Sequence, residues 1–249
     1  MNGEIPPSRR LTDLRKKARS FIYAHPAPRF CWIKFRQIQT LLRFPSSWLN
    51  GWLFDTWNRI DSRQERRLDG LTIKGPYGPE ATGYGTIGSK ILFHAMSSLR
   101  ISFNDYAFVD FGSGKGQAVL LASRLPFKMA IGVEFAKELH DVALRNARSW
   151  RPKRICGRVE FVWADVLEFE IPQEPCVIYL YHPFSEFILR RVLENILRSI
   201  AVCPRDIIIV YVNPAYEQAI RSLPNVEPIS RSVKQAYSAY RILPSSRSH

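Results

Sequence analysis

A short glycine-rich segment limits the fold of this chain more than any other feature. Residues 107–123 read AFVDFGSGKGQAVLLAS, in which an apolar run of strand length leads to Asp110 and an apolar helical pattern follows. Between them, glycines stand at alternate positions, namely Gly112, Gly114 and Gly116. Strand, tight turn and helix form the first half of a βαβ nucleotide-binding unit, because glycine lets the backbone turn sharply and approach a ligand closely.

The spacing of the glycines distinguishes among the types of ligand that such a loop can bind. A phosphate-binding P-loop requires Ser or Thr after Gly-Lys, but Lys115 is followed by Gly116. A dinucleotide-binding loop requires Gly-x-Gly-x-x-Gly, and here the third glycine comes one residue early. The pattern is Asp-x-Gly-x-Gly-x-Gly, which resembles the first motif of the class I S-adenosylmethionine-dependent methyltransferases.

This resemblance implies S-adenosylmethionine as the cofactor and transfer of its methyl group as the activity. In that family the acid lies near the methionine end of the cofactor, and the glycines let the sulfonium and ribose lie over the loop. The first cofactor-binding residues implied are Asp110, Gly112, Ser113, Gly114 and Gly116. The alternative is a glycine turn without a ligand.

Two further acids follow later strands. Residues 129–133 form a second apolar strand, and Glu134 lies about twenty residues beyond the loop, where a ribose-binding carboxylate is expected. A carboxylate there can accept hydrogen bonds from both ribose hydroxyls, although an acid also ends strands for solubility alone. Residues 159–163 form a third strand. By the resemblance, Asp165 and Val166 after it bind the adenine, and a solvated loop acid is the alternative.

A fourth apolar strand, 176–181, ends in Tyr181-His182-Pro183-Phe184. In class I methyltransferases this loop faces the transferable methyl, and members acting on amino nitrogens often carry Asn or Asp, then Pro-Pro and an aromatic residue. The sequence resembles that motif but has His182 in the polar position and a single proline. We expect His182 and Tyr181 to be catalytic and Pro183 and Phe184 to bind substrate. His182 is either a base near neutral pH or a hydrogen-bonded loop residue.

The segment before the glycine loop, residues 77–99, joins a glycine-rich half to a helical pattern. In many class I enzymes a segment at this place forms a lid whose Tyr or Thr hydroxyls reach the cofactor or substrate, and glycine hinges allow it to close. We therefore expect Tyr84 and Thr86 to contact the cofactor. An ordinary loop is the alternative.

The order of the expected elements predicts an α/β fold. It is a doubly wound, mostly parallel, Rossmann-like methyltransferase sheet that ends in an antiparallel strand pair at 226–233 and 239–243. A chain of 249 residues is long enough for one such domain with an extension. We expect a basic, Trp-rich helical extension over residues 1–75 and the S-adenosylmethionine-binding domain over residues 76–249.

The extension carries much of the positive charge. The chain has a formal charge of +14, and residues 1–70 hold 14 Lys and Arg against 6 Asp and Glu. Such a segment can attract an acidic partner, a nucleic acid or an anionic lipid surface, or it can be a solvated surface. Its apolar residues recur at helical spacing, as in Trp48, Leu49, Trp52, Leu53 and Trp57. This stripe can lie in a membrane surface or pack on the parent domain, and we expect packing.

Several function classes find no support in the sequence. The four cysteines are scattered, which fits neither a disulfide framework nor a zinc site and favours a reducing cytoplasm. No metal site and no membrane-spanning segment is expected. The methyl acceptor is not identified by any pattern. The alternative to an enzyme is a non-catalytic nucleotide-binding or membrane-surface module that keeps the fold. The acids Asp110, Glu134 and Asp165 favour the enzyme.

Overall fold

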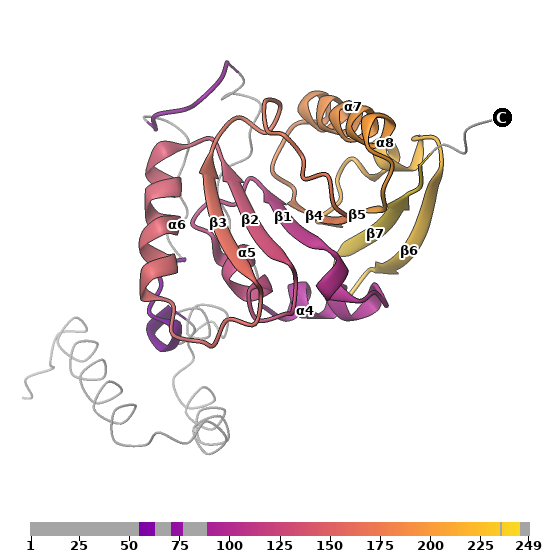
Figure 1. Cartoon of the computed structure of the whole chain (residues 1–249). Coiled ribbons are helices and arrows are strands. Elements are labelled where there is room, and N and C mark those ends of the chain that lie inside the picture. The colour runs from indigo at the N-terminus through magenta and orange to yellow at the C-terminus, as the bar shows by residue number, and fades with distance from the viewer. Residues whose placement is uncertain (1–54, 63–70, 77–88, 235, 245–249) are drawn as a thin grey trace, which may run out of the picture. The chain divides into compact units, whose positions relative to one another are not determined.

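The computed structural model describes residues 55–62, 71–76, 89–234 and 236–244, which form the coloured ribbon of Figure 1. The chain divides into two compact units, Met1–Leu53 and Phe54–His249, and every described residue belongs to the second. Most of the expected extension therefore lies outside the described residues. The expected lid residues Tyr84 and Thr86 lie outside them as well.

Seven strands form one sheet. They are β1 (Ala107–Phe111), β2 (Met129–Glu134), β3 (Arg158–Trp163), β4 (Cys176–Tyr181), β5 (Ile207–Val212), β6 (Val226–Ser232) and β7 (Tyr237–Ile242). Their order is β3-β2-β1-β4-β5-β7-β6. Strands β1 to β5 pair in parallel, whereas β7 is antiparallel to both β5 and β6. The predicted parallel sheet with an antiparallel closing pair is confirmed.

Helices cover both faces of this sheet (Figure 1). They are α4 (Ser89–Ser98), α5 (Gln117–Ala122), α6 (Lys137–Ser149), α7 (Glu186–Val202) and α8 (Glu217–Arg221), with a short 3-10 turn, η2 (Phe103–Asp105). Apolar residues of α4 and α5 share one core with the sheet, and those of α7 and α8 share the other. In α7 the buried residues recur three or four apart, which aligns them on one face of the helix.

The central strands are apolar because helices pack on both of their faces. Every residue of β1 and β5 is buried, and so are all but the last of β4. Asp110 differs from its apolar neighbours in β1 because it is a buried acid, one residue before the strand ends at Phe111. A carboxyl group in such a strand indicates a functional role, because burial without a partner is unfavourable.

Two short segments that precede the sheet pack against it. Ile60 is buried in the core with α4 and α5, and Ile73 forms an isolated antiparallel bridge with Ala136. Trp57 is the only described residue of the tryptophan stripe, and 48% of it is exposed. The other residues of the stripe lie outside the described residues, so its expected packing remains a prediction. Within the described residues, no helix is long and apolar enough to cross a bilayer.

Candidate functional site

The loops that follow β1 and β4 meet where the strand order reverses. Strand β1 has β2 on one side and β4 on the other, so the chain changes direction across the sheet between β1 and β4. Ligands of doubly wound folds bind in the crevice at such a switch point, at the carboxyl ends of the strands. The two loops are in contact there, because a Cβ atom added to Gly112 would lie 2.8 Å from Cβ of Pro183.

The glycine loop has the backbone conformation that its sequence predicts. The φ angles of Gly112, Gly114 and Gly116 are +78°, +52° and +81°, in the region that other residues rarely adopt. Two N–H groups at the start of the loop donate to the carbonyl oxygen of Val133, each at 3.0 Å. A Cβ atom on Gly116 would lie 2.5 Å from Cε1 of Phe161. The dihedral angles favour glycine at all three positions, and packing also requires it at Gly112 and Gly116.

Glu134 holds this loop in place. Its carboxylate is buried; Oε2 accepts a hydrogen bond from the Gly114 N–H at 2.7 Å, and Oε1 accepts one from the Ala136 N–H at 2.9 Å. One side chain thus links the glycine loop to the residue before α6. Each carboxylate oxygen has a second lone pair, so Glu134 can also accept hydrogen bonds from a ribose. That contact with ribose remains a prediction.

Burial shifts both acids toward the protonated form. Burial raises the pKa of Glu134 to about 7, although the backbone N–H groups of Ala136 and Gly114 lower it. Burial also raises the pKa of Asp110 well above its ordinary value, and the charge of Glu134 adds to this. Among the described residues, no hydrogen bond reaches the Asp110 carboxyl group. The pair is complementary to a ligand that brings positive charge and hydrogen-bond donors.

Two further polar atoms beside these acids have no partner among the described residues. The Ser113 hydroxyl in the glycine loop and the Tyr179 hydroxyl in β4 are both buried without a hydrogen bond. Tyr179 lies directly opposite Asp110 in the sheet, and burial together with the Asp110 charge raises its pKa. Buried polar groups are normally paired, so these hydroxyls are available to a ligand.

Asp165 lies under the segment 71–76. It is buried, and its Oδ1 accepts a hydrogen bond from the Leu167 N–H at 2.9 Å. A Cβ atom on Gly75 would lie 2.2 Å from Oδ2, so the segment passes directly over the carboxyl group. Val166 is half-buried beside it. The adenine contact predicted for Asp165 and Val166 is not tested by this geometry, but the carboxyl group does stand at the expected strand end.

His182 is held at the end of β4 in an unusual conformation. Its φ angle is +43°, and its Nδ1 lies 3.1 Å from the Tyr211 hydroxyl. The His182 ring also packs against Tyr216, with 5.6 Å between ring centroids. Burial raises the pKa of Tyr211 to about 12, so its hydroxyl stays protonated at neutral pH. A strained residue with a fixed ring at a strand end is typical of a functional site.

The other residues of this loop differ in exposure. Tyr181 and Pro183 are half-buried, whereas Phe184 is buried in the core under α7. Ser185 follows and caps α7 through the Ile188 N–H at 3.5 Å. Pro183 thus lies beside the glycine loop, whereas the catalytic roles expected for Tyr181 and His182 remain predictions. Phe184 supports the loop from below, and its substrate contact remains a prediction.

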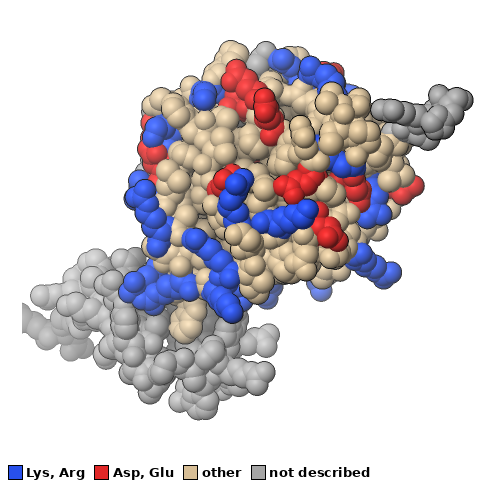
Figure 2. All heavy atoms as spheres, in the orientation of Figure 1, with Lys and Arg blue, Asp and Glu red and all other residues tan. Residues whose placement is uncertain are grey.

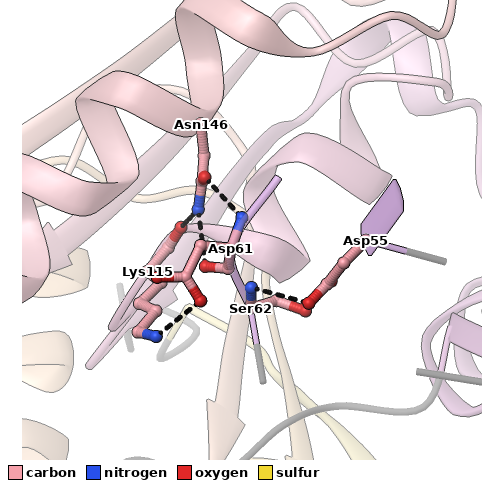
Figure 3. Close-up of polar contacts among 5 residues, drawn as sticks. All are labelled: Asp55, Asp61, Ser62, Lys115 and Asn146. Atoms are coloured by element: carbon pink, nitrogen blue, oxygen red, sulfur yellow. Dashed lines mark hydrogen bonds and ion pairs between the residues drawn. The ribbon is translucent and has the colours of Figure 1, made fainter. Parts of the chain in front are cut away.

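A polar cluster next to the glycine loop was not predicted from the sequence (Figure 3). The Lys115 side chain is 0% exposed, and its Nζ forms an ion pair with Asp61 at 2.9 Å, although the Asp61 side chain is 57% exposed. The Asn146 amide of α6 donates to the carbonyl oxygens of Lys115 and Asp61 at 2.9 and 3.0 Å. It also accepts from the Asp61 N–H at 2.9 Å.

This cluster joins three parts of the chain that are distant in sequence. Asp61 comes from the segment 55–62, Lys115 from the glycine loop and Asn146 from α6. The only feature of the local sequence that could have indicated this cluster is Lys115, a lysine inside a glycine loop that is not a P-loop. Within the same segment, Ser62 donates its hydroxyl to Asp55 at 2.6 Å. The Ser62–Asp55 bond lies within the segment, and the Asp61–Lys115 pair connects the segment to the glycine loop.

Comparisons with known proteins yielded solved structures only. No family model and no curated protein matches the chain. An RNA methyltransferase from Salinibacter ruber in complex with S-adenosyl-L-homocysteine is 16% identical over 65% of this chain and 95% of its own, with a TM-score of 0.45. A ribosomal protein L11 methylase from Lactobacillus delbrueckii is 13% identical over 68% and 83%, with a TM-score of 0.47. A magnesium protoporphyrin IX methyltransferase from Synechocystis, with bound SAM, is 14% identical over 63% and 79%, with a TM-score of 0.44.

The sheet itself decides the fold. Strand β7 is inserted antiparallel between β5 and β6, and a glycine loop follows β1 at the switch point. The strand order and the antiparallel closing pair are those of the Rossmann-like methyltransferase sheet that the sequence predicts. In this methyltransferase fold the described residues contain no cluster of His, Cys, Asp and Glu that could hold a metal ion. The candidate ligand groups are therefore the acids, hydroxyls and backbone of the crevice.

Asn146→Ala should lower the free energy of unfolding by about 2–3 kcal/mol, because three hydrogen bonds are lost and buried carbonyl groups are left without donors. Urea denaturation at constant pH measures this. Asn195→Ala is the matched control, since that α7 amide donates one bond, to the Leu167 carbonyl oxygen at 2.9 Å, and accepts one from the exposed Arg198 side chain. It should cost about 1 kcal/mol. Equal losses in the two variants would contradict the role given to Asn146.

The raised pKa of Glu134 predicts a pH dependence of stability. The folded protein binds the proton more tightly than the unfolded chain, so stability is highest at low pH and falls as pH rises from about 4.5 to about 7. The expected contribution is about 3 kcal/mol. It is measured as the difference in unfolding free energy between wild type and Glu134→Gln at several pH values. A difference that is constant over this range would show that Glu134 has an ordinary pKa.

Proposed function

We propose that the protein binds S-adenosylmethionine and transfers its methyl group to an acceptor. The observation that carries this proposal is the pair of buried acids, Asp110 and Glu134, beside a glycine loop at the switch point of the sheet. S-adenosylmethionine carries a sulfonium, an ammonium group and a ribose diol. These groups would bring the positive charge that both acids lack, and the hydrogen-bond donors that Asp110 lacks, among the described residues.

Each part of the proposed cofactor has a residue of suitable chemistry. Asp110 would accept hydrogen bonds near the methionine end, and Glu134 would accept them from the ribose. Asp165 would accept one from the adenine amino group, because its Oδ2 makes no backbone bond of the kind that Oδ1 makes. The hydroxyls of Ser113 and Tyr179 would gain partners. Binding would lower the pKa of both buried acids, since charge and donors favour the carboxylate form.

The chemistry needs little from the protein beyond placement. The cofactor supplies a good leaving group when bound, so acceleration comes mainly from holding the acceptor in line with the methyl group. The loop after β4 is in contact with the glycine loop through Pro183. His182, fixed by Tyr211, would orient the acceptor or remove its proton. A module that binds the nucleotide without catalysis is the alternative.

S-adenosylmethionine and S-adenosylhomocysteine should bind with micromolar Kd, or about −8 kcal/mol. Calorimetry on the full chain measures this. Gly114→Val should abolish binding, because Val avoids a φ of +52° and the loop would lose its shape. Glu134→Ala should weaken binding by about 1.5–3 kcal/mol. Glu194→Ala, at an exposed position on α7, is the control that should keep full affinity.

The direct contact of Glu134 with the ribose needs a separate test, because Glu134 also holds the loop. Wild type should bind the 2′-deoxy analogue of S-adenosylhomocysteine about tenfold more weakly than the parent compound, the value of one hydrogen bond. Glu134→Gln should show a smaller preference. No heat with either cofactor, together with binding of a nicotinamide dinucleotide, would refute the proposed function.

His182→Ala should lower turnover about a hundredfold and leave cofactor affinity nearly unchanged, because the residue acts on the acceptor in the transition state. Methyl transfer is followed with labelled cofactor, on an acceptor found by comparing methylation in a knockout and wild type. His182→Asn should keep much of the activity if the side chain only forms hydrogen bonds, and lose it if proton removal is essential.

The control for backbone strain is Asn213→Ala. Asn213 ends β5 as His182 ends β4, and its φ angle of +49° is similar. A comparable loss of turnover in Asn213→Ala would mean that strand-end conformation matters more than the imidazole. Full turnover in His182→Ala would show that the histidine serves packing only.

A further inference from the structure

A strongly basic surface lies on the methyltransferase-fold unit, away from the crevice. Residues 145–158 contain six Lys and Arg and no Asp or Glu. The six are Arg145, Arg148, Arg151, Lys153, Arg154 and Arg158, and all are exposed. Arg59 joins them, because its carbonyl oxygen accepts the Ser149 hydroxyl at 2.5 Å. Figure 2 shows Lys and Arg side chains gathered at the lower left, over the region of α6, with Asp and Glu side chains higher and to the right.

The acids that border this surface are already paired. Asp141 forms an ion pair with Lys137 at 2.6 Å, and Glu160 forms one with Arg158 at 2.9 Å. Asp61 is paired with the buried Lys115. The remaining basic residues of the surface form no ion pair with another described residue. Their charge is therefore available to an anionic partner.

Two large apolar side chains stand within the basic surface. Trp57 is 48% exposed and Ile155 is 56% exposed. Trp57 is two residues from Arg59, and Ile155 follows Arg154. The Arg154 guanidinium in turn bonds the Ala147 carbonyl oxygen of α6. Trp and apolar residues among Lys and Arg are typical of surfaces that enter the headgroup region of a membrane.

The place of this surface in the fold argues against substrate binding. The segment 150–157 leaves the carboxyl end of α6 and leads into the start of β3. The crevice lies beyond the other end of β3, about 17 Å along a strand of six residues. An acceptor held on the basic surface would therefore stand far from the methyl group. A partner that anchors the protein, with the crevice turned away from it, fits this geometry.

We infer that this surface, formed by Trp57, Arg59 and residues 145–158, docks the protein on an anionic phospholipid bilayer. A bilayer rather than a nucleic acid is indicated because two large apolar side chains, Trp57 and Ile155, are exposed among the basic residues. Exposed apolar side chains among Lys and Arg match an interface of lipid tails and anionic headgroups. Nucleic acid would instead need a basic track that leads to the crevice. The exclusion of nucleic acid rests on the proposed function, whereas binding to a bilayer does not.

The test is flotation of the full chain with phosphatidylcholine vesicles that contain about 30 mol% phosphatidylglycerol. Wild type should float with these vesicles, not with pure phosphatidylcholine, and high salt should release it. Arg145→Gln, Arg148→Gln and Arg151→Gln together should weaken binding about a hundredfold, since each basic residue near the surface contributes about fivefold. Trp57→Ser should weaken it about tenfold.

The matched control removes three charges from another part of the unit. It combines Arg198→Gln, Arg221→Gln and Lys234→Gln, all at exposed positions, and should bind like wild type. Equal effects of the two triple variants would overturn the inference, as would no flotation of wild type. Binding of single-stranded RNA that the first triple variant loses, without vesicle binding, would assign the surface to nucleic acid and also overturn it. Thermal unfolding checks that every variant is folded.

Discussion

The crevice depends on one buried carboxylate. Glu134 accepts the N–H groups of Gly114 and Ala136, and so fixes the glycine loop against the start of α6. A loop with three positive φ angles belongs to no helix or strand, so its amides need other partners. Those of Gly112 and Ser113 bond the Val133 carbonyl oxygen, and Gly114 needs a further partner. The carboxylate supplies one. Burial destabilises the charged carboxylate more than these two hydrogen bonds stabilise it, so the pKa of Glu134 rises to about 7.

The elements of the site that the sequence predicted are local in sequence. Parallel strands buried on both faces appear as apolar runs, so β1, β2, β4 and β5 were recognisable from composition alone. Positive φ angles favour glycine, so the loop was recognisable from Gly112, Gly114 and Gly116. Glu134 and Asp165 stand directly at or after strand ends. A fold that places strand ends together then brings these residues to one edge.

Two features depend on contacts that no local pattern encodes. The Lys115–Asp61 pair spans 54 positions, and the bond from Asn146 to Asp61 spans 85. The helical spacing of the tryptophan stripe predicted a helix but not which side of it would be covered. Residues 55–58 are helical, yet the buried side chains there are Asp55 and Asn58, while Trp57 is exposed. Contacts with other parts of the chain determine which side of the helix is buried.

Helix α6 serves the crevice and the basic surface with different faces. Successive residues of a helix are about 100° apart, so Asn146 points inward to Lys115 while its neighbours Arg145 and Arg148 are exposed. Contacts of the inward face fix the glycine loop, and the outward face carries charge that the fold does not use. The outward residues can therefore change without loss of the bonds that shape the crevice. The arginines of α6 can thus serve a partner outside the chain, as the inferred docking on a bilayer requires.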